Sequence, residues 1–251
     1  MTVEKPWHED NEFWKLLDPV LFSEKRWAVT EEEVAGIIKL TSLEPGERVL
    51  DLCCGPGRHS LELARRGFVV TGVDRTLPYL ERARAATEKE GLSVEFVHED
   101  MRNFCRPGAF DVAMNYYTSF GYFRDKSENE KVLKNLFSSL RPGGRLLLEL
   151  MGREVLARIF RERDWLERDG VFLLEERKVE DNWTWIDNRW IVFKDGKKKE
   201  FSLTLRLYSA VDLSSILESV GFEETKSYGD IAGSPYDHTA KRLILAAKKP
   251  G

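Results

Sequence analysis

From position 48 onward, the chain repeats one unit: an apolar strand-like run, a helix-like segment, and a glycine before the next run. These glycines stand at positions 67, 91, 143 to 144 and 221. Glycine readily adopts the left-handed conformation that ends many helices. Strands that alternate with helices form a mainly parallel sheet with helices on both faces. The repeat therefore predicts a doubly wound α/β fold, in which ligands bind beyond the C-terminal ends of the strands.

The C-terminal end of the chain departs from this unit. Phe222–Tyr228 and Arg242–Ala247 have strand-like patterns, and the loop between them is too short for a crossover helix. We therefore expect the last strand to run antiparallel to its neighbour.

The first unit carries the stretch VLDLCCGPGRHS at positions 49–60, which is typical of a strand, a tight turn and a helix start. The turn glycines let the backbone approach a ligand, and the free N–H groups of the helix attract a negative group. Phosphate-binding loops have Lys and then Ser or Thr after the last glycine, where this chain has Arg58 and His59. The dinucleotide fingerprint needs a third glycine, where this chain has Ser60.

An acid appears at the distance expected for a ribose ligand. Asp74 ends the strand-like run 68–73, where a carboxylate can accept both hydroxyls of a ribose. Because neither phosphate-binding pattern is complete, the residues indicate a nucleoside that carries a carboxylate rather than phosphates.

These residues resemble the class I S-adenosylmethionine (SAM) dependent methyltransferases. DLCCGPG at 51–57 is similar to the first motif of that family and GVD at 72–74 to the second, although Cys53 stands where the family often has its first glycine. The resemblance covers residues 45–150 well. It implies a Rossmann-like, seven-stranded sheet with an antiparallel last strand, and SAM as cofactor with S-adenosylhomocysteine as product.

The resemblance also implies roles for residues at the strand ends. In the family, the position of Asp100 binds the adenine amino group, and Met101 can pack on the base; a turn or capping acid is the alternative for Asp100. Arg26 is a candidate for the methionine carboxylate, with a solvated surface arginine as the alternative. The full set expected to bind the cofactor is Trp14, Arg26, Asp51, Cys53, Gly55, Gly57, His59, Asp74, Arg75, Asp100, Met101, Asn115 and Tyr116.

The fourth strand end, AMNYYTSFGYF at 113–123, is the expected site of chemistry. Family enzymes that methylate nucleobase amino groups or a glutamine have Asn or Asp, two prolines and an aromatic residue here. In this chain Tyr116 and Tyr117 follow Asn115 without a proline, which weakens that interpretation. An aromatic-lined pocket remains, since ring faces attract a sulfonium or ammonium cation. The alternative for Phe120, Tyr122 and Phe123 is an aromatic core cluster.

The expected catalytic residues are Tyr117, His238 and Tyr236. The last two lie in the C-terminal loop, where either can act as a base if the loop folds over the crevice. A surface position without a catalytic role is the alternative for His238.

The repeat is interrupted after Met151. We therefore expect three parts: an N-terminal helical cover over 1–44, a SAM-binding domain over 45–152 and 209–251, and an insertion over 153–208. In the cover, Thr30 and Glu33 suggest a capping box. In the insertion, 153–167 predicts a charged helix, and the runs 171–178, 183–194 and 199–208 predict an antiparallel β ribbon with a hairpin at Asp195-Gly196. Its strand-borne Trp183 and Trp185 either form the insertion's own core or mark a substrate cover or homodimer contact.

The net charge of −4 argues against general affinity for nucleic acid or anionic membranes. The chain has no long apolar segment, and its three cysteines have no zinc-type spacing, so we expect a cytoplasmic protein with neither a membrane span nor a metal site. The leading hypothesis is a SAM-dependent methyltransferase acting on a small molecule, with N-methylation favoured over O-methylation. The alternatives are a methyltransferase acting on RNA or protein, a nicotinamide dehydrogenase, and a SAM-binding module without turnover.

Overall fold

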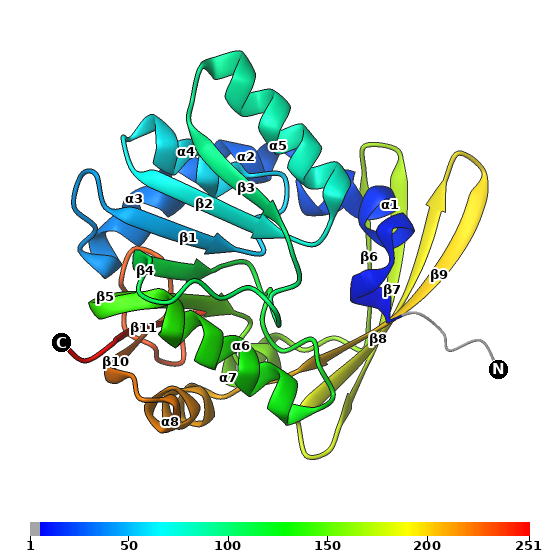
Figure 1. Cartoon of the computed structure of the whole chain (residues 1–251). Coiled ribbons are helices and arrows are strands. Elements are labelled where there is room, and N and C mark those ends of the chain that lie inside the picture. Colours follow the sequence, from blue (N-terminus) through cyan, green and yellow to red (C-terminus); the bar gives the residue numbers. More distant parts are fainter. Residues whose placement is uncertain (1–5) are drawn as a thin grey trace.

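The computed structural model describes residues 6–251 and contains a seven-stranded sheet in the order β10-β11-β5-β4-β1-β2-β3 (Figure 1). Strands β1 to β5 pair in parallel, whereas β11 pairs antiparallel with both β5 and β10. This topology confirms the predicted doubly wound sheet and its antiparallel last strand. The strands are β1 (Arg48–Leu52), β2 (Val69–Asp74), β3 (Val94–His98), β4 (Phe110–Asn115), β5 (Leu140–Leu150), β10 (Glu223–Tyr228) and β11 (Leu243–Lys248).

Helices cover both faces of this sheet because alternate strand residues point to opposite faces. On one face, Val34, Ile37 and Leu63 of the helices pack with Val49 and other strand residues. On the other, leucines of α6 and α8 pack against β1, β4 and β5. The helices of the domain are α3 (Thr30–Thr41), α4 (Arg58–Arg65), α5 (Leu77–Glu90), α6 (Lys126–Ser139), α7 (Arg153–Ile159) and α8 (Ala210–Val220).

A second sheet, called here the insert sheet, has four antiparallel strands in the order β6-β7-β8-β9. Asp195 and Gly196 both have positive φ and form the predicted hairpin between its last two strands. The strands are β6 (Arg163–Arg168), β7 (Val171–Glu180), β8 (Trp185–Lys194) and β9 (Lys197–Arg206).

Two predictions for the insertion are wrong in detail. The charged helix ends at Ile159 rather than at Glu167, and residues 163–168 form β6 instead. In that segment Leu166 faces the apolar cluster under the sheet while Trp165 is 62% exposed, which is the alternation of an edge strand. Trp183 lies in the turn before β8 and packs on Phe160, so Trp183 and Trp185 do not share a strand face.

The N-terminal segment lies between the two sheets (Figure 1). It consists of η1 (Trp7–Glu9), α1 (Asn11–Leu21) and α2 (Glu24–Ala28). Phe13, Leu17 and Val20 of α1 pack on the inner face of the insert sheet. The predicted capping box at the start of α3 is absent, because Thr30 donates to the carbonyl of Arg26 and Glu33 binds side chains of α4.

Candidate active site

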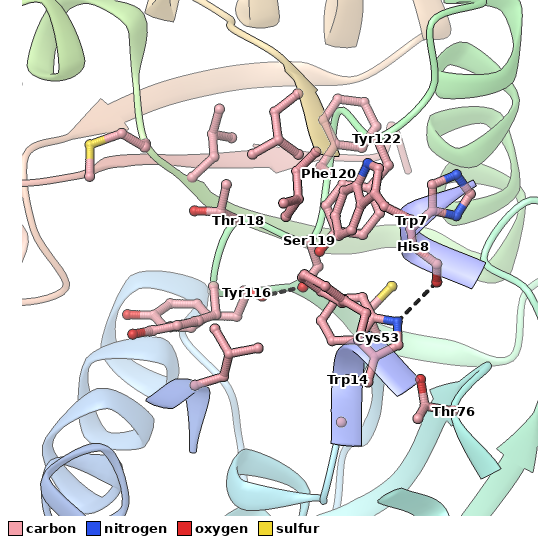
Figure 2. Close-up of a pocket in the computed structure, with 18 of the residues that line it drawn as sticks. Trp7, His8, Trp14, Cys53, Thr76, Tyr116, Thr118, Ser119, Phe120 and Tyr122 are labelled. Carbon is pink, nitrogen blue, oxygen red and sulfur yellow. Dashed lines mark hydrogen bonds between the residues drawn. The ribbon is translucent and has the colours of Figure 1, made fainter. Parts of the chain in front are cut away.

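A cavity of about 580 Å³ lies between the C-terminal ends of β1 to β4 and the inner face of the insert sheet. The strand ends line one half of it and the insert sheet lines the other, with η1 and α1 between them. Figure 2 shows Trp7, Trp14 and Tyr122 gathered around the part above Cys53. The fold therefore encloses one continuous space large enough for two small molecules or parts of them.

The turn after β1 begins this cavity. Cys53 has a φ of 66°, and the N–H groups of Cys53 and Cys54 both donate to the carbonyl of Val73, at 2.7 and 3.0 Å. Gly55 also has positive φ, and a Cβ there would lie 3.0 Å from the Phe22 ring. Gly57 faces away from the cavity, where a Cβ would lie 2.9 Å from Ala83. The lack of a side chain at Gly55 leaves space at the floor of the cavity, and the lack of one at Gly57 allows α4 to pack on α5.

Two acids support this floor. Asp51 is buried and accepts a hydrogen bond of 2.6 Å from Ser60 Oγ; burial raises its pKa above the usual range. Asp74 accepts the N–H of Gly55 at 2.9 Å and the N–H of Thr76 at 2.7 Å, one on each carboxylate oxygen. Each oxygen of Asp74 keeps a further lone pair, so this carboxylate can still accept the two hydroxyls of a ribose.

Asp100 follows the end of β3, and its carboxylate is bound by a guanidinium. The guanidinium of Arg102 donates to Asp100 from Nε at 2.9 Å and from Nη2 at 2.7 Å. Burial alone would raise the pKa of Asp100, but the hydrogen bonds and charge of Arg102 lower it below the usual range. Met101 is buried against Cys53, with 3.6 Å between the two sulfur atoms. This pair forms an apolar floor next to an ionised carboxylate.

The segment η1 to α1 closes the cavity above these acids. The carbonyl of His8 accepts a hydrogen bond from Trp14 Nε1 at 3.0 Å (Figure 2) and another from Arg75 Nη1 at 2.9 Å. The rings of Trp7 and Tyr122 lie 4.7 Å apart. Burial lowers the pKa of His8 to about 4, so this ring is neutral at pH 7. The cover over the strand ends is therefore aromatic, and its histidine is uncharged at pH 7.

The fourth strand ends in a bent segment. Tyr117 and Thr118 have φ values of 69° and 56°, a conformation that costs non-glycine residues about 1 kcal/mol each. The buried Glu149 of β5 stabilises this bend, because its carboxylate accepts the Tyr117 N–H at 2.6 Å and pairs with Arg242. Arg242 in turn donates to Thr118 Oγ1 at 2.6 Å.

Arginines surround the ring of Tyr117, and they differ in their partners. Arg58 pairs with Glu33 and Arg242 with Glu149. Arg26, by contrast, has no carboxylate partner within residues 6–251. Burial, followed by the charge of Arg242, lowers its pKa below the usual range. This part of the cavity carries excess positive charge and suits an anionic group.

Most of the residues predicted from the sequence line the cavity, and some do not. Asn115 is fully buried beneath it and donates to the carbonyl of Leu52 at 3.1 Å. Tyr236 bonds to Glu154 in the C-terminal loop, and His238 is exposed there, so the structure brings neither to the cavity. Those that line it are Trp14, Arg26, Asp51, Cys53, Gly55, His59, Asp74, Arg75, Asp100, Met101, Tyr116 and Tyr117.

The sequence reasoning missed Glu149, Arg242 and the polar residues of the insert sheet. It also missed Arg168, which lines the cavity and donates to the carbonyl of Val20 at 3.1 Å. Glu149 had a usable signal, since it is the one acid in the otherwise apolar run 146–150. Arg168 and Arg242 had none, because their partners lie more than ninety residues away in the chain.

Comparison with known proteins agrees with this geometry. A family model described as a methyltransferase domain matches residues 49–144, which contain the turn, Asp74 and Asp100. The CcbJ methyltransferase from Streptomyces caelestis has the same fold, with a TM-score of 0.80, 17% identity and 99% coverage of both chains. Residues 49–144 therefore form a methyltransferase domain, and the chain is a SAM-dependent methyltransferase. Its cofactor is SAM.

Two further proteins resemble this methyltransferase along most of its length. The Bacillus subtilis protein YqeM, whose name places it among the methyltransferases, is 26% identical over 214 residues, 83% of this chain and 86% of its own. CalS10, an amino pentose methyltransferase from Micromonospora echinaspora solved with SAM bound, has a TM-score of 0.59 and 20% identity, covering 98% of this chain and 92% of its own. At such identities, the solved structures establish the fold.

The cavity residues fit SAM. Asp74 keeps free acceptor positions for a diol, Arg26 offers an unpaired cation for a carboxylate, and the rings of the cover offer π faces for a sulfonium. Within residues 6–251, no group of His, Cys, Asp and Glu side chains has the arrangement of a metal site, and no helix is long and apolar enough to cross a membrane.

Proposed function

We propose that this methyltransferase transfers the methyl group of SAM to an amine of a small molecule held on the insert sheet. The observation that carries the proposal is the single cavity, which joins the strand ends to the inner face of that sheet. An acceptor on the insert sheet can therefore meet a cofactor on the strand ends without crossing solvent. CalS10, whose name describes an amino pentose methyltransferase, supports an amine acceptor.

In this proposal each end of the cofactor has a partner. Asp74 binds the ribose hydroxyls, and Asp100 with Met101 holds the adenine through the remaining acceptor capacity of the carboxylate and the packing of the polarizable thioether on the ring. Arg26 pairs with the methionine carboxylate. Of the three arginines around the Tyr117 ring, Arg26 is the one without a carboxylate partner within residues 6–251. A ligand carboxylate bound to Arg26 would therefore offset the repulsion between Arg26 and the guanidinium groups of Arg58 and Arg242.

When bound, SAM supplies an electrophilic methyl group. The chain's own task is to hold the acceptor nitrogen in line behind that methyl and to keep water out. Trp7, Trp14 and Tyr122 form the dry aromatic wall for this task. A neutral amine needs no base within the enzyme, whereas a hydroxyl does, and Tyr236 and His238 lie away from the cavity. N-methylation is therefore favoured over O-methylation.

The proposal is tested first with the cofactor product and then with acceptors. Calorimetry with S-adenosylhomocysteine should give one site per chain, and the Asp74→Ala variant should bind it at least tenfold more weakly. Incubation with methyl-labelled SAM should then transfer label to members of a panel of primary amines. Transfer only to added RNA or protein would contradict the small-molecule assignment, and absence of S-adenosylhomocysteine binding would contradict the whole proposal.

A further inference from the structure

The half of the cavity formed by the insert sheet is not uniformly apolar. Its wall consists of Leu166, Leu173, Ile186 and Leu205, which face the cavity from four different strands. Into this wall the sheet places a polar group of three residues, Glu175 and Arg177 of β7 and Asn188 of β8, all lining the same cavity. We call these three residues the polar row.

The strand register brings the polar row together. Arg177 lies directly opposite Asn188 in the β7–β8 pair, and Asn188 lies opposite the inward-facing Leu203 of β9. Glu175 is two residues before Arg177 and therefore on the same face of the sheet. The side chains of Glu175 and Arg177 form an ion pair. The neighbouring side chains on this face of the insert sheet pack against α1. The polar row therefore lies where that apolar contact ends and the cavity begins.

The neighbour of the row that points to a ligand is Trp190, which lies directly opposite Glu175 in the β7–β8 pair. Its indole Nε1 is buried and has no hydrogen-bond partner among residues 6–251. A buried N–H normally finds an acceptor, because leaving it unpaired is unfavourable. Since Trp190 lines the cavity beside the polar row, a molecule bound there can supply the missing acceptor.

The electrostatics of the row restrict which molecule this is. Glu175 and Arg177 together carry no net charge, so a fully charged substituent meets attraction from one and repulsion from the other. Burial raises the pKa of Glu175, although the charge of Arg177 opposes this. A hydroxyl both donates and accepts, and so it can satisfy a carboxylate, a guanidinium and an amide in turn.

We propose that the polar row of Glu175, Arg177 and Asn188 selects an acceptor that carries hydroxyl groups on the frame bearing its amine. The inference rests on the proposed function and deepens it, because it assigns the acceptor a chemical class. A purely apolar amine would bury the polar row and the Trp190 N–H without offering them a hydrogen bond, and sites built for hydroxyls reject such analogues strongly.

The test uses two ring amines that differ in their hydroxyls, glucosamine and cyclohexylamine. Each is titrated by calorimetry into the full chain saturated with S-adenosylhomocysteine. The wild-type chain should bind glucosamine more tightly than cyclohexylamine by about tenfold or more. In Glu175→Gln and in Asn188→Leu this preference should fall to about threefold or less, while the affinity for S-adenosylhomocysteine stays unchanged.

Glu176→Gln is the matched control, because Glu176 is the next residue of β7 and pairs with Arg189 on the opposite, exposed face. This variant should retain the wild-type preference. The assignment would be overturned if the wild-type chain bound the two amines equally, preferred cyclohexylamine, or bound neither at millimolar concentration. It would also be overturned if the preference were unchanged in Glu175→Gln and Asn188→Leu. Failure of the wild-type chain to bind S-adenosylhomocysteine would instead overturn the proposed function, and the assignment with it.

Discussion

The guanidinium of Arg26 lies 4.5 Å from the centroid of the Tyr117 ring. Arg26 comes from the short helix α2 of the N-terminal cover, and Tyr117 from the bend after β4, so this contact joins the cover to the strand ends. Arg58 and Arg242 approach the same ring but have carboxylate partners. The ring therefore holds an uncompensated cation at the place where the proposal puts the methionine carboxylate.

Replacing Arg26 with Met should weaken binding of S-adenosylhomocysteine by about 1.5 to 3 kcal/mol, because a charge-assisted contact to the carboxylate is lost. Calorimetry measures this directly. Lys25→Met is the control, since Lys25 is exposed beside Arg26 on the same helix and should leave the affinity unchanged. Equal affinities of the Arg26 variant and the wild type would remove Arg26 from the cofactor site.

The strand-end residues that the sequence predicted share one property: their position follows from local chain geometry. Asp51, Gly55 and Asp74 occupy strand ends and a tight turn, and parallel strands necessarily bring these ends to one edge. Arg168 and Arg242 owe their positions to partners far away in sequence, which no local pattern encodes. The polar row required the register of β7 and β8, which depends on a strand pairing rather than on composition.

The misassigned segment 163–168 illustrates the same limit. Its charged residues fit a helical face as well as an alternating strand, because six residues span fewer than two helical turns. Pairing with β7 decides between the two, since Trp165 lies opposite Leu174 and Leu166 opposite Leu173. A tertiary interaction therefore overrode an ambiguous local pattern.

Asp74→Asn and Asp100→Asn should differ in their effect on cofactor affinity. Asp74 has acceptor capacity left for the ribose, so its variant should lose about 1.5 to 3 kcal/mol of S-adenosylhomocysteine binding. Asp100 is already engaged by two guanidinium nitrogens of Arg102, so its variant should lose less binding. Calorimetry on both variants at one pH makes the comparison, and a larger loss in Asp100→Asn would reverse the two assignments.

Glu149→Gln should destabilise the chain, because the variant leaves Arg242 without its buried carboxylate and weakens the anchor of the Tyr117–Thr118 bend. The expected loss in the free energy of unfolding is about 3 kcal/mol, measured by urea denaturation. Glu90→Gln breaks an exposed pair with Arg65 and should cost less than about 1 kcal/mol. Similar losses of stability in Glu149→Gln and Glu90→Gln would contradict the role of Glu149 as the anchor of the bend. The Glu149 variant should also bind S-adenosylhomocysteine more weakly, because Tyr117 no longer positions Arg26.

His8 should make the stability of the chain depend on pH. Burial lowers its pKa to about 4, whereas an unfolded histidine has its usual value of about 6.5. Between pH 6.5 and 4 the unfolded state therefore binds a proton at His8 that the folded state does not. Above pH 6.5 this histidine leaves the free energy of unfolding unchanged, and as the pH falls toward 4 it lowers that free energy progressively. The full loss of stability is about 3 kcal/mol.

The variant His8→Phe tests this pH dependence. His8 packs edge-on against Phe123, so His8→Phe should fold, and its stability should fall less than that of the wild type between pH 6.5 and 4. The exposed His238→Phe control should follow the wild type in urea denaturation across this range. Parallel curves for the wild type and His8→Phe would mean that His8 is protonated in the folded chain and that the cover over the strand ends is wet.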